Sequence, residues 1–336
     1  MITTSLNALI TAERLNLRND VPLLPLGLHF GLDEDRYYAD PAIGSTQIRQ
    51  LARNPQAYWS DSWMNPRRIP HHSTLSQVRG TALHQLVYFG VDYFNDHYLC
   101  GADQKGLSQG EKSANTKRAN KLADAVGKIA LKFDDYERVM IAAAMIVKNP
   151  ELAGVFASGK PEISLFWQTD DGIRCKARMD YIKHRRFDNV AGIGELKSNA
   201  NPFELDFHES CRHAIGRYAY DEQASWYMDA AAHWIPRHVA DGAVYGSDYN
   251  AEWLDLLASA TSWAWQWVFA GIEGPPLTWS AILSPENPIV ADARRMNELG
   301  LANYRKFLAH YGTEQWLLIE TPRELMLEEM PAWFRR

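Results

Sequence analysis

The stretch that follows Lys160 constrains the fold more than any other part of the chain, because its residues alternate between two faces. Residues 162–168 alternate, Asp170-Asp171-Gly172 is a turn signal, and residues 173–182 alternate again. Alternation of this kind is typical of β-strands that bury one face. The pattern predicts a β-hairpin, followed by a third strand over residues 190–196.

Helical periodicity surrounds these three strands. Ser45 or Thr46 can cap one helix, and Asn149-Pro150 ends another. The order of helices, strands, helices, strands and helix predicts an α/β fold with a mixed central β-sheet flanked by helices. Helices are predicted over residues 45–54, 76–92, 134–148, 202–215, 218–234 and 288–311, and two further strands over 262–272 and 277–283.

The remaining segments suggest how the chain is divided. Residues 1–44 contain Pro22, Pro25 and Pro41, which predicts an irregular N-terminal arm. Residues 45–336 are expected to form one domain, with a helical part at 45–150, a catalytic sheet and its helices at 160–234, and C-terminal strands and a helix at 260–336. Residues 101–120 are polar and contain glycine, so we expect a mobile loop there.

Composition excludes several classes of protein. The 336 residues carry a formal net charge of −6, which excludes a globally basic nucleic-acid coat but not a local basic groove. Cys100, Cys175 and Cys211 lie far apart, so a disulfide framework and a zinc ribbon lack their ligands. The sequence shows no signal peptide, no apolar run long enough to cross a bilayer, and neither common nucleotide-binding glycine motif. We expect a reduced cytoplasmic protein with no membrane partner.

Acidic and basic residues gather at the end of the three strands. Asp180 ends a polar strand face, and on the next strand Glu195 shares a face with Lys197. If the two strands pair, both acids and the lysine converge. Neighbouring carboxylates repel, and a hard divalent cation such as Mg²⁺ or Mn²⁺ removes that conflict. With Lys197 orienting or deprotonating a metal-bound water, these are the parts of metal-assisted phosphodiester hydrolysis.

An ordinary surface salt bridge is the competing interpretation of this spacing, because an acid followed by E-x-K occurs by chance on many surfaces. Gly192 and Gly194 weigh against it, since glycines inside a strand often mark the close approach of a backbone or a ligand. Two weaker signals are Gln223 and Tyr227, which share a helix face, and His84, although a single helical histidine is more often structural than a ligand.

Five short motifs occur in one order along the chain: G-x-x-x-H at 80–84, P-E-I-S at 161–164, R-M-D at 178–180, E-L-K at 195–197 and Y-x-x-Q-x-x-x-Y at 220–227. This set resembles the PD-(D/E)xK nuclease superfamily, and within it the branch that holds the RecB-type nuclease domains and the RecE-like exonuclease VIII. The resemblance runs from about residue 45 to the C-terminus and implies a restriction-endonuclease-like core. The chain departs from that branch at Glu195, where aspartate is usual.

The resemblance also implies a metal cofactor and a set of site residues. The cofactor would be Mg²⁺, with Mn²⁺ as a substitute. The implied roles are metal ligation by His84, Asp180, Glu195 and the Leu196 carbonyl, catalysis by Lys197 with the two acids, contact with the substrate by Gln223 and Tyr227, and an additional site role for Glu162.

Binding of phosphates requires local positive charge, whatever the net charge of the chain. Between residues 174 and 186, six basic residues stand against Asp180 alone, a local excess of +5 around the expected site. Among them we expect Arg174, Lys176 and Arg178 to contact DNA, together with Tyr220. A second basic cluster, within residues 112–121, is either a clamp for a strand or a solvated face.

These features together predict a metal-dependent DNA exonuclease. The resemblance implies double-stranded DNA ends as the substrate, in recombination of the phage or prophage type, and products with 5′-phosphates and 3′-hydroxyls. It further implies a ring-like homo-oligomer and a RecT-like single-strand annealing protein as partner. Two alternatives stay open: a nuclease fold kept as a DNA-binding or assembly module with weak or no catalysis, and a site-specific endonuclease.

Overall fold

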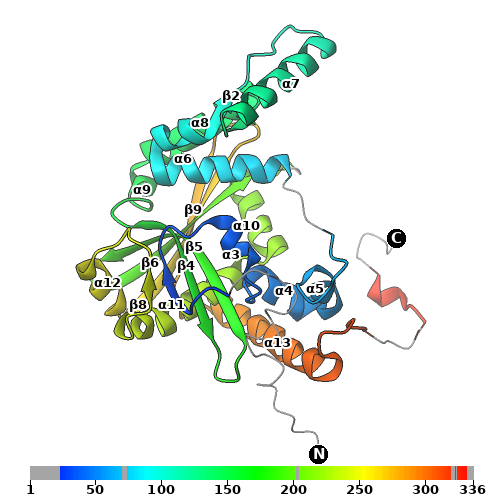
Figure 1. The fold of residues 1–336 in the computed structure, drawn as a ribbon, viewed down its shortest axis with the longest axis vertical. Helices are drawn as coiled ribbons and strands as arrows, with labels where there is room; N and C mark the ends of the chain where they lie inside the picture. Colours follow the sequence, from blue (N-terminus) through cyan, green and yellow to red (C-terminus); the bar gives the residue numbers. More distant parts are fainter. Residues whose placement is uncertain (1–22, 70–73, 202–203, 319–321, 323, 331–336) are drawn as a thin grey trace, which may run out of the picture.

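A seven-stranded mixed sheet forms the centre of the protein (Figure 1). The computed structural model describes residues 23–69, 74–201, 204–318, 322 and 324–330. The strand order is β7-β1-β4-β5-β6-β8-β9, and a separate small sheet pairs β2 with β3. The strands are β1 (Gly27–His29), β2 (Tyr98–Cys100), β3 (Ile129–Leu131), β4 (Lys160–Gln168), β5 (Arg174–Arg185), β6 (Val190–Asn199), β7 (Val244–Tyr245), β8 (Ser262–Gly271) and β9 (Thr278–Leu283).

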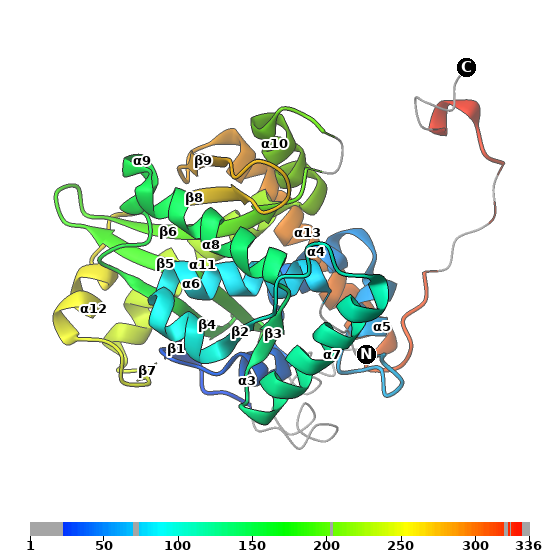
Figure 2. The same ribbon diagram turned by 90° about the horizontal axis from the view of Figure 1, so that it is seen from above.

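Helices cover both faces of the sheet (Figure 2). Helix α11 packs on one face, with α4 and α13 behind it, and α6 and α8 pack on the other. Each face has its own buried apolar cluster, so the sheet is the shared wall of two cores. The helices are α3 (Glu34–Ala39), α4 (Ser45–Arg53), α5 (Pro55–Asp61), α6 (Leu75–His97), α7 (Gln109–Ala125), α8 (Phe133–Lys148), α9 (Pro150–Ala153), α10 (Phe207–Tyr218), α11 (Tyr220–Ala240), α12 (Ala251–Ala258), α13 (Pro288–Tyr311) and the 3₁₀ turn η1 (Leu327–Glu329).

The predicted hairpin and third strand are confirmed. Strands β4, β5 and β6 pair antiparallel in chain order, with Ile163 opposite Met179 and Tyr181 opposite Gly194. Strand β6 then pairs parallel with β8, which pairs antiparallel with β9, so the sheet is mixed as expected. A Cβ on Gly194 would lie 2.9 Å from a side-chain atom of Val155. This glycine therefore admits a packed neighbour on the α6 side of the sheet rather than a ligand.

Two segments expected to lack regular structure contain elements. Residues 1–22 of the expected irregular arm lie outside the described residues, but β1 follows them and pairs with β4 and β7 in the central sheet. The expected mobile loop at 101–120 contains the first twelve of the 17 residues of α7, which starts with a capping box between Ser108 and Glu111. Periodicity could not reveal α7, because Ala123 is its one buried residue. Strand β1 is too short to give a pattern.

No helix in the described parts of the chain combines the length and apolar character needed to span a membrane.

Helices α4 and α13 approach closely at Gly300. A Cβ on this residue would lie 2.5 Å from the backbone oxygen of Ile48 and 3.0 Å from its side chain. Ile48 is fully buried and belongs to the core behind α11. A larger residue would therefore push α13 away from the helix that it packs against.

We predict that Gly300→Ala destabilises the protein by about 1–3 kcal/mol, the usual effect of overpacking a dense core. Gly216→Ala is the matched control, because Gly216 is an exposed residue of α10 with nothing near its Cβ position. That change should raise the free energy of unfolding by about 0.5–1 kcal/mol. Chemical denaturation of both variants tests this, and a Gly300→Ala protein as stable as the parent would contradict the close packing.

Candidate functional site

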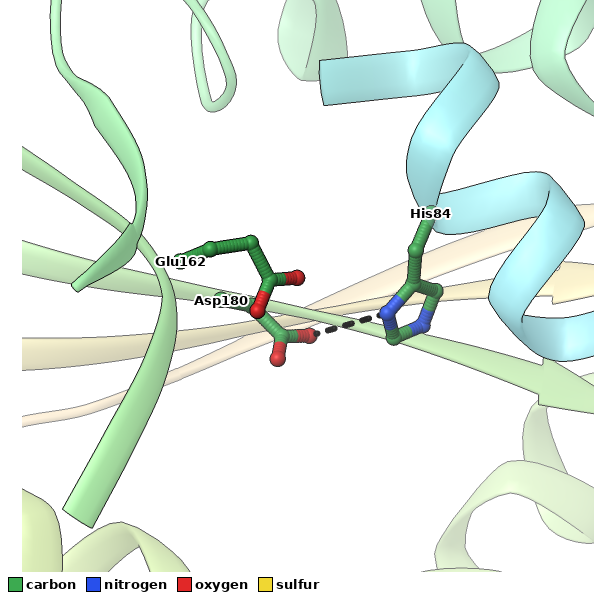
Figure 3. A group of neighbouring side chains, drawn as sticks. All are labelled: His84, Glu162 and Asp180. Carbon is green, nitrogen blue, oxygen red and sulfur yellow. Dashed lines mark ion pairs between the residues drawn. The ribbon is translucent and has the colours of Figure 1, made fainter. Parts of the chain in front are cut away.

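Two carboxylates and a histidine meet where β4 and β5 pass beneath α6 (Figure 3). Glu162 stands opposite Asp180 in the β4–β5 register, because their neighbours Ile163 and Met179 are paired. The Nδ1 atom of His84 lies 3.6 Å from Oδ2 of Asp180. One ligand atom from each of the three residues lies within 4.8 Å of the others, close enough to share one metal ion.

Asp180 is enclosed by groups from two other elements. The Tyr88 hydroxyl of α6 donates to its Oδ2 at 3.0 Å, and the Leu196 backbone N–H of β6 donates to the same oxygen at 3.2 Å. Burial, and after it the charge of Glu162, raises the pKa of Asp180 to about 7. The two donated hydrogen bonds favour the ionised form but do not offset these effects.

Glu195 lies next along the sheet, on β6. Its Oε1 accepts from Lys197 Nζ at 2.5 Å and from Gln223 Nε2 at 2.8 Å. Its Oε2 is buried and has no hydrogen-bond partner within the described structure. Burial, followed by the charge of Asp180, raises the pKa of Glu195 to about 7. A buried carboxylate oxygen without a donor is a costly arrangement that a cation would relieve.

Lys197 is the cation held at the centre of this group. Its Nζ also lies 3.3 Å from Gln223 Oε1 and 4.5 Å from the centre of the Tyr220 ring. Burial works against the charged ammonium, but the negative charges around it, led by that of Glu195, outweigh burial and raise the pKa of Lys197. Lys197 is therefore a fixed positive charge, and its ammonium lies over the half-buried ring of Tyr220.

Glu162 has an uncommon backbone conformation. Its φ is +54°, the left-handed region, although it lies within a strand and is not glycine. Such a conformation costs about 1–3 kcal/mol and is found most often at functional sites. The carboxylate that it turns toward Asp180 also accepts from Nε of Arg178 at 2.6 Å. The backbone thus bends where a third carboxylate joins the site.

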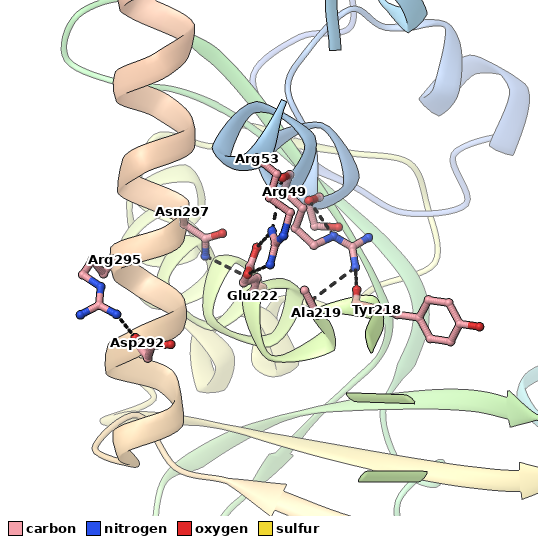
Figure 4. A network of polar contacts seen from close by, with 9 residues as sticks. Arg49, Arg53, Tyr218, Ala219, Glu222, Asp292, Arg295 and Asn297 are labelled. Carbon is pink, nitrogen blue, oxygen red and sulfur yellow. Dashed lines mark hydrogen bonds and ion pairs between the residues drawn. The ribbon is translucent and has the colours of Figure 1, made fainter. Parts of the chain in front are cut away.

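The N-terminus of α11 is positioned by polar contacts with α4 and α13 (Figure 4). Arg53 of α4 makes two hydrogen bonds, at 2.6 and 2.9 Å, with the buried carboxylate of Glu222. Asn297 of α13 donates to the Glu222 backbone oxygen at 3.0 Å, and Arg49 donates to the backbone oxygen of Tyr218. Since Gln223 follows Glu222 directly, this network fixes the helix end that supplies a side chain to Glu195.

The structure brings most residues implied by the resemblance into one place. Besides the acids, Lys197 and Gln223, it places Tyr227 in the buried layer beneath them, where the Glu195 charge acts on its hydroxyl. Burial lowers the pKa of His84, and its contact with the Leu196 backbone acts in the opposite direction. Sequence reasoning missed Tyr88, because a tyrosine one turn after His84 belongs to no motif.

The basic residues expected to bind DNA have partners inside the protein. Arg174 pairs with Asp40 at 2.8 Å, and Lys176 is buried, with its Nζ donating to the backbone oxygens of Tyr37 and Asp40. The local excess of +5 is therefore largely consumed, and a DNA-contact role for Arg174 and Lys176 does not fit their contacts. The remaining pairs are Arg178 with Glu162, Lys183 with the Gly154 carbonyl, Arg185 with Asp188 and Arg186 with Glu252.

The donor set fits a hard divalent cation. Three carboxylates lie near one lysine and one arginine. Burial raises the pKa of two of these carboxylates, Asp180 and Glu195, and one buried oxygen of Glu195 has no donor in the described structure. Carboxylate oxygens, a backbone carbonyl and an imidazole are the ligands that Mg²⁺ or Mn²⁺ accepts. Burial lowers the pKa of His84, which keeps its ring neutral and able to coordinate.

The chain shares its fold with a protein of known structure. No family profile matches the sequence, and no curated protein matches it either. A candidate exonuclease from Eubacterium rectale superposes with a TM-score of 0.52 at 12% identity, over 88% of this chain and 97% of that chain. A phage-related exonuclease from Haemophilus somnus overlaps more loosely, with a TM-score of 0.27 at 12% identity, over 61% of this chain and 85% of that chain.

The raised carboxyl pKa values predict how stability depends on pH when no cation is present. Asp180 and Glu195 stay protonated in the folded protein up to a pKa of about 7, whereas the unfolded chain releases these protons near the ordinary pKa values of 3.8 and 4.5. Between these limits the folded state binds more protons, so these two groups make the free energy of unfolding fall as pH rises.

Asp180→Asn removes one of the two groups and weakens the effect on the other. In the presence of a chelator, we expect its stability to change less than that of the parent between pH 5.5 and 8, and to exceed that of the parent at pH 8. Urea denaturation at both pH values measures this difference, in which titration of His84 and other groups largely cancels. Parallel pH profiles for the two proteins would show that Asp180 titrates normally.

Proposed function

We propose that this protein is a metal-dependent nuclease that hydrolyses phosphodiester bonds in DNA. The observation that carries this proposal is the convergence of Glu162, Asp180 and Glu195 around His84 and Lys197. Three carboxylates that meet in one partly buried place are not a structural salt bridge, because the cations beside them leave one buried Glu195 oxygen without a donor in the described structure. The shared fold with a candidate exonuclease supports the same reaction class.

The residues that would hold the cation are His84, Glu162, Asp180, Glu195 and the backbone oxygen of Leu196. A bound Mg²⁺ or Mn²⁺ supplies a water of lowered pKa and screens the charge on the scissile phosphate. We include the Leu196 oxygen because the backbone of Leu196 already contacts His84 and Asp180.

The other residues of the chain position the reactants. Lys197, fixed by Glu195 and Gln223, presents a permanent positive charge to a phosphate whose negative charge grows in the transition state. Because burial and its neighbours keep Lys197 protonated, electrostatic stabilisation and donation of a hydrogen bond suit it better than the role of general base. Tyr88 holds the Asp180 carboxylate in one orientation toward the site.

We further propose that the enzyme acts on the ends of double-stranded DNA and leaves 5′-phosphates and 3′-hydroxyls. The resemblance of the five motifs to RecE-like exonucleases supports this. The fold shared with the candidate exonuclease from Eubacterium rectale supports action at an end of the nucleic-acid chain, and no more. A role in phage-type recombination, a ring-like homo-oligomer and a RecT-like annealing partner are parts of the same proposal.

The proposal predicts cleavage that depends on a divalent cation, on Lys197 and on DNA ends. Linear and covalently closed circular DNA are incubated with the protein in Mg²⁺, in Mn²⁺ and in EDTA. We expect nucleotide release from linear DNA only, none in EDTA, and at least about 10²-fold slower release by Lys197→Ala, as is usual for a positioned catalytic group. Lys183→Ala is the matched control, since its ammonium donates to the Gly154 carbonyl, away from the carboxylates.

Each other outcome assigns a different function. Cutting of closed circles would identify an endonuclease. DNA binding without cleavage in either metal would support a binding or assembly module and contradict the proposed catalysis.

Helix α7 carries exposed basic side chains that are available to bind DNA phosphates, whereas those of β5 are paired inside the protein. Lys117, Arg118 and Lys121 are exposed on this helix, which projects beside β2 and β3 at the far end of α6 (Figure 1). If these side chains contact phosphates, neutralising all three reduces the steepness with which the DNA-binding constant falls with salt concentration, on logarithmic scales, by about 2–3. Replacing all three with glutamine and measuring DNA affinity over a range of salt tests this. Arg186→Gln, whose guanidinium pairs with Glu252, should leave the slope unchanged.

A further inference from the structure

The second half of α6 carries a row of aromatic rings that leads away from the metal-binding group. The Phe89 and Tyr93 rings lie 4.6 Å apart, and the Tyr93 and His97 rings are stacked at 4.0 Å. The row begins one residue after Tyr88, which is hydrogen bonded to Asp180. Gly90, with φ +87°, interrupts the helix here and sets the direction of the last two rings.

The rings of the row are open to solvent to different degrees. Tyr93 is half-buried, and burial, followed by the charge of Glu162, raises the pKa of its hydroxyl. Phe89 is 41% exposed, and His97 is also exposed. Exposed rings in a row beside a functional site are unusual for a surface that contacts only water.

A third exposed ring belongs to α3, near the residues that pair with Glu162. Tyr38 of α3 is 66% exposed and meets the Tyr37 ring edge-on at 5.4 Å. The Tyr37 ring in turn faces the guanidinium of Arg178, 5.6 Å from the ring centre, and Arg178 pairs with Glu162. Tyr38 therefore connects to Glu162 through the Tyr37 ring and the Arg178 guanidinium, and it lies on a different helix from Tyr93.

The basic side chains of β5 are already paired inside the protein, which limits how they can hold DNA near the site. Arg174, Lys176 and Arg178 are bound to internal acids and carbonyls, and the whole chain has a net charge of −6. Neutralisation of phosphates close to the site is therefore limited. Aromatic rings bind unpaired bases by stacking, which requires no positive charge and no particular base sequence.

We propose that Tyr38, Phe89, Tyr93 and His97 form a stacking surface that receives the unpaired bases of a single DNA strand at the mouth of the metal-binding site. The inference rests on the proposed nuclease function and specifies its substrate: the strand that reaches the carboxylates is single, and a duplex end must open before it is cut. Bases in a closed duplex have no free faces for these rings.

Equilibrium binding tests the inference without cleavage. The full chain is titrated, with Ca²⁺ in place of Mg²⁺, against a fluorescent single strand, a blunt duplex, and the same duplex with mismatched terminal pairs. Tyr38→Ala and Tyr93→Ala should each weaken binding of the single strand and of the mismatched end by roughly 5- to 150-fold, the contribution of one stacked base. Binding of the blunt duplex should change much less.

Two variants separate stacking from other roles. Tyr93→Phe keeps the ring and should bind like the parent protein, whereas loss of binding would assign the effect to the hydroxyl and overturn the inference. Phe187→Ala removes another highly exposed ring, in the β5–β6 turn, and should have no effect. Tyr38 is exposed, so its variant remains informative even if Tyr93→Ala folds poorly.

The remaining outcomes are also decisive. Equal losses on all three DNAs, or none, would overturn the inference. A changed oligomeric state on sedimentation, with single-strand affinity intact, would instead assign the rings to contact with a second copy. If the parent protein cleaves linear DNA while the ring variants bind normally, the stacking surface fails and the nuclease function stands; if the parent neither binds nor cleaves, both fail.

Discussion

Repulsion among three carboxylates that are wholly or partly buried is the interaction that the surrounding structure must offset. Glu162, Asp180 and Glu195 come from three adjacent strands, and burial raises the pKa of the last two. Lys197 offsets part of the charge, and Arg178 offsets part of it on the other side. A fold selected only for stability would replace such a group with apolar residues of similar size. Such a group is typical of a place where charge serves binding or catalysis, in accord with the proposed metal site.

The rest of the structure holds this unfavourable group in place. The hairpin register sets Glu162 against Asp180, and the positive φ of Glu162 turns its carboxylate toward the site. Helix α6 supplies His84 and Tyr88 from one face of the sheet. Helix α11 supplies Gln223 from the other face, and the Arg53–Glu222 pair fixes its first turn. Each helix is fastened to the sheet by its own apolar core.

Local patterns predicted the parts of the site that depend only on strand alternation and helical spacing. Alternation along β5 and β6 was sufficient to bring Asp180 near Glu195 and Lys197, and the predicted bounds of α13, 288–311, match the structure. Contacts between residues far apart in the sequence could not be predicted. Asp40 and Glu252 neutralise arginines of β5 and the turn after it across 134 and 66 residues, so a charge count within a short window overestimated the free positive charge.

Calorimetric titration with Mg²⁺ in two buffers of different ionisation enthalpy tests whether these acids form a metal site. If the carboxylates hold the cation, binding must displace the protons that their raised pKa values retain. We predict proton release on binding near pH 6.5, little or none at pH 9, and loss of binding in Asp180→Asn. Absence of binding, or binding that releases no protons near pH 6.5, would contradict a metal centre formed by these acids.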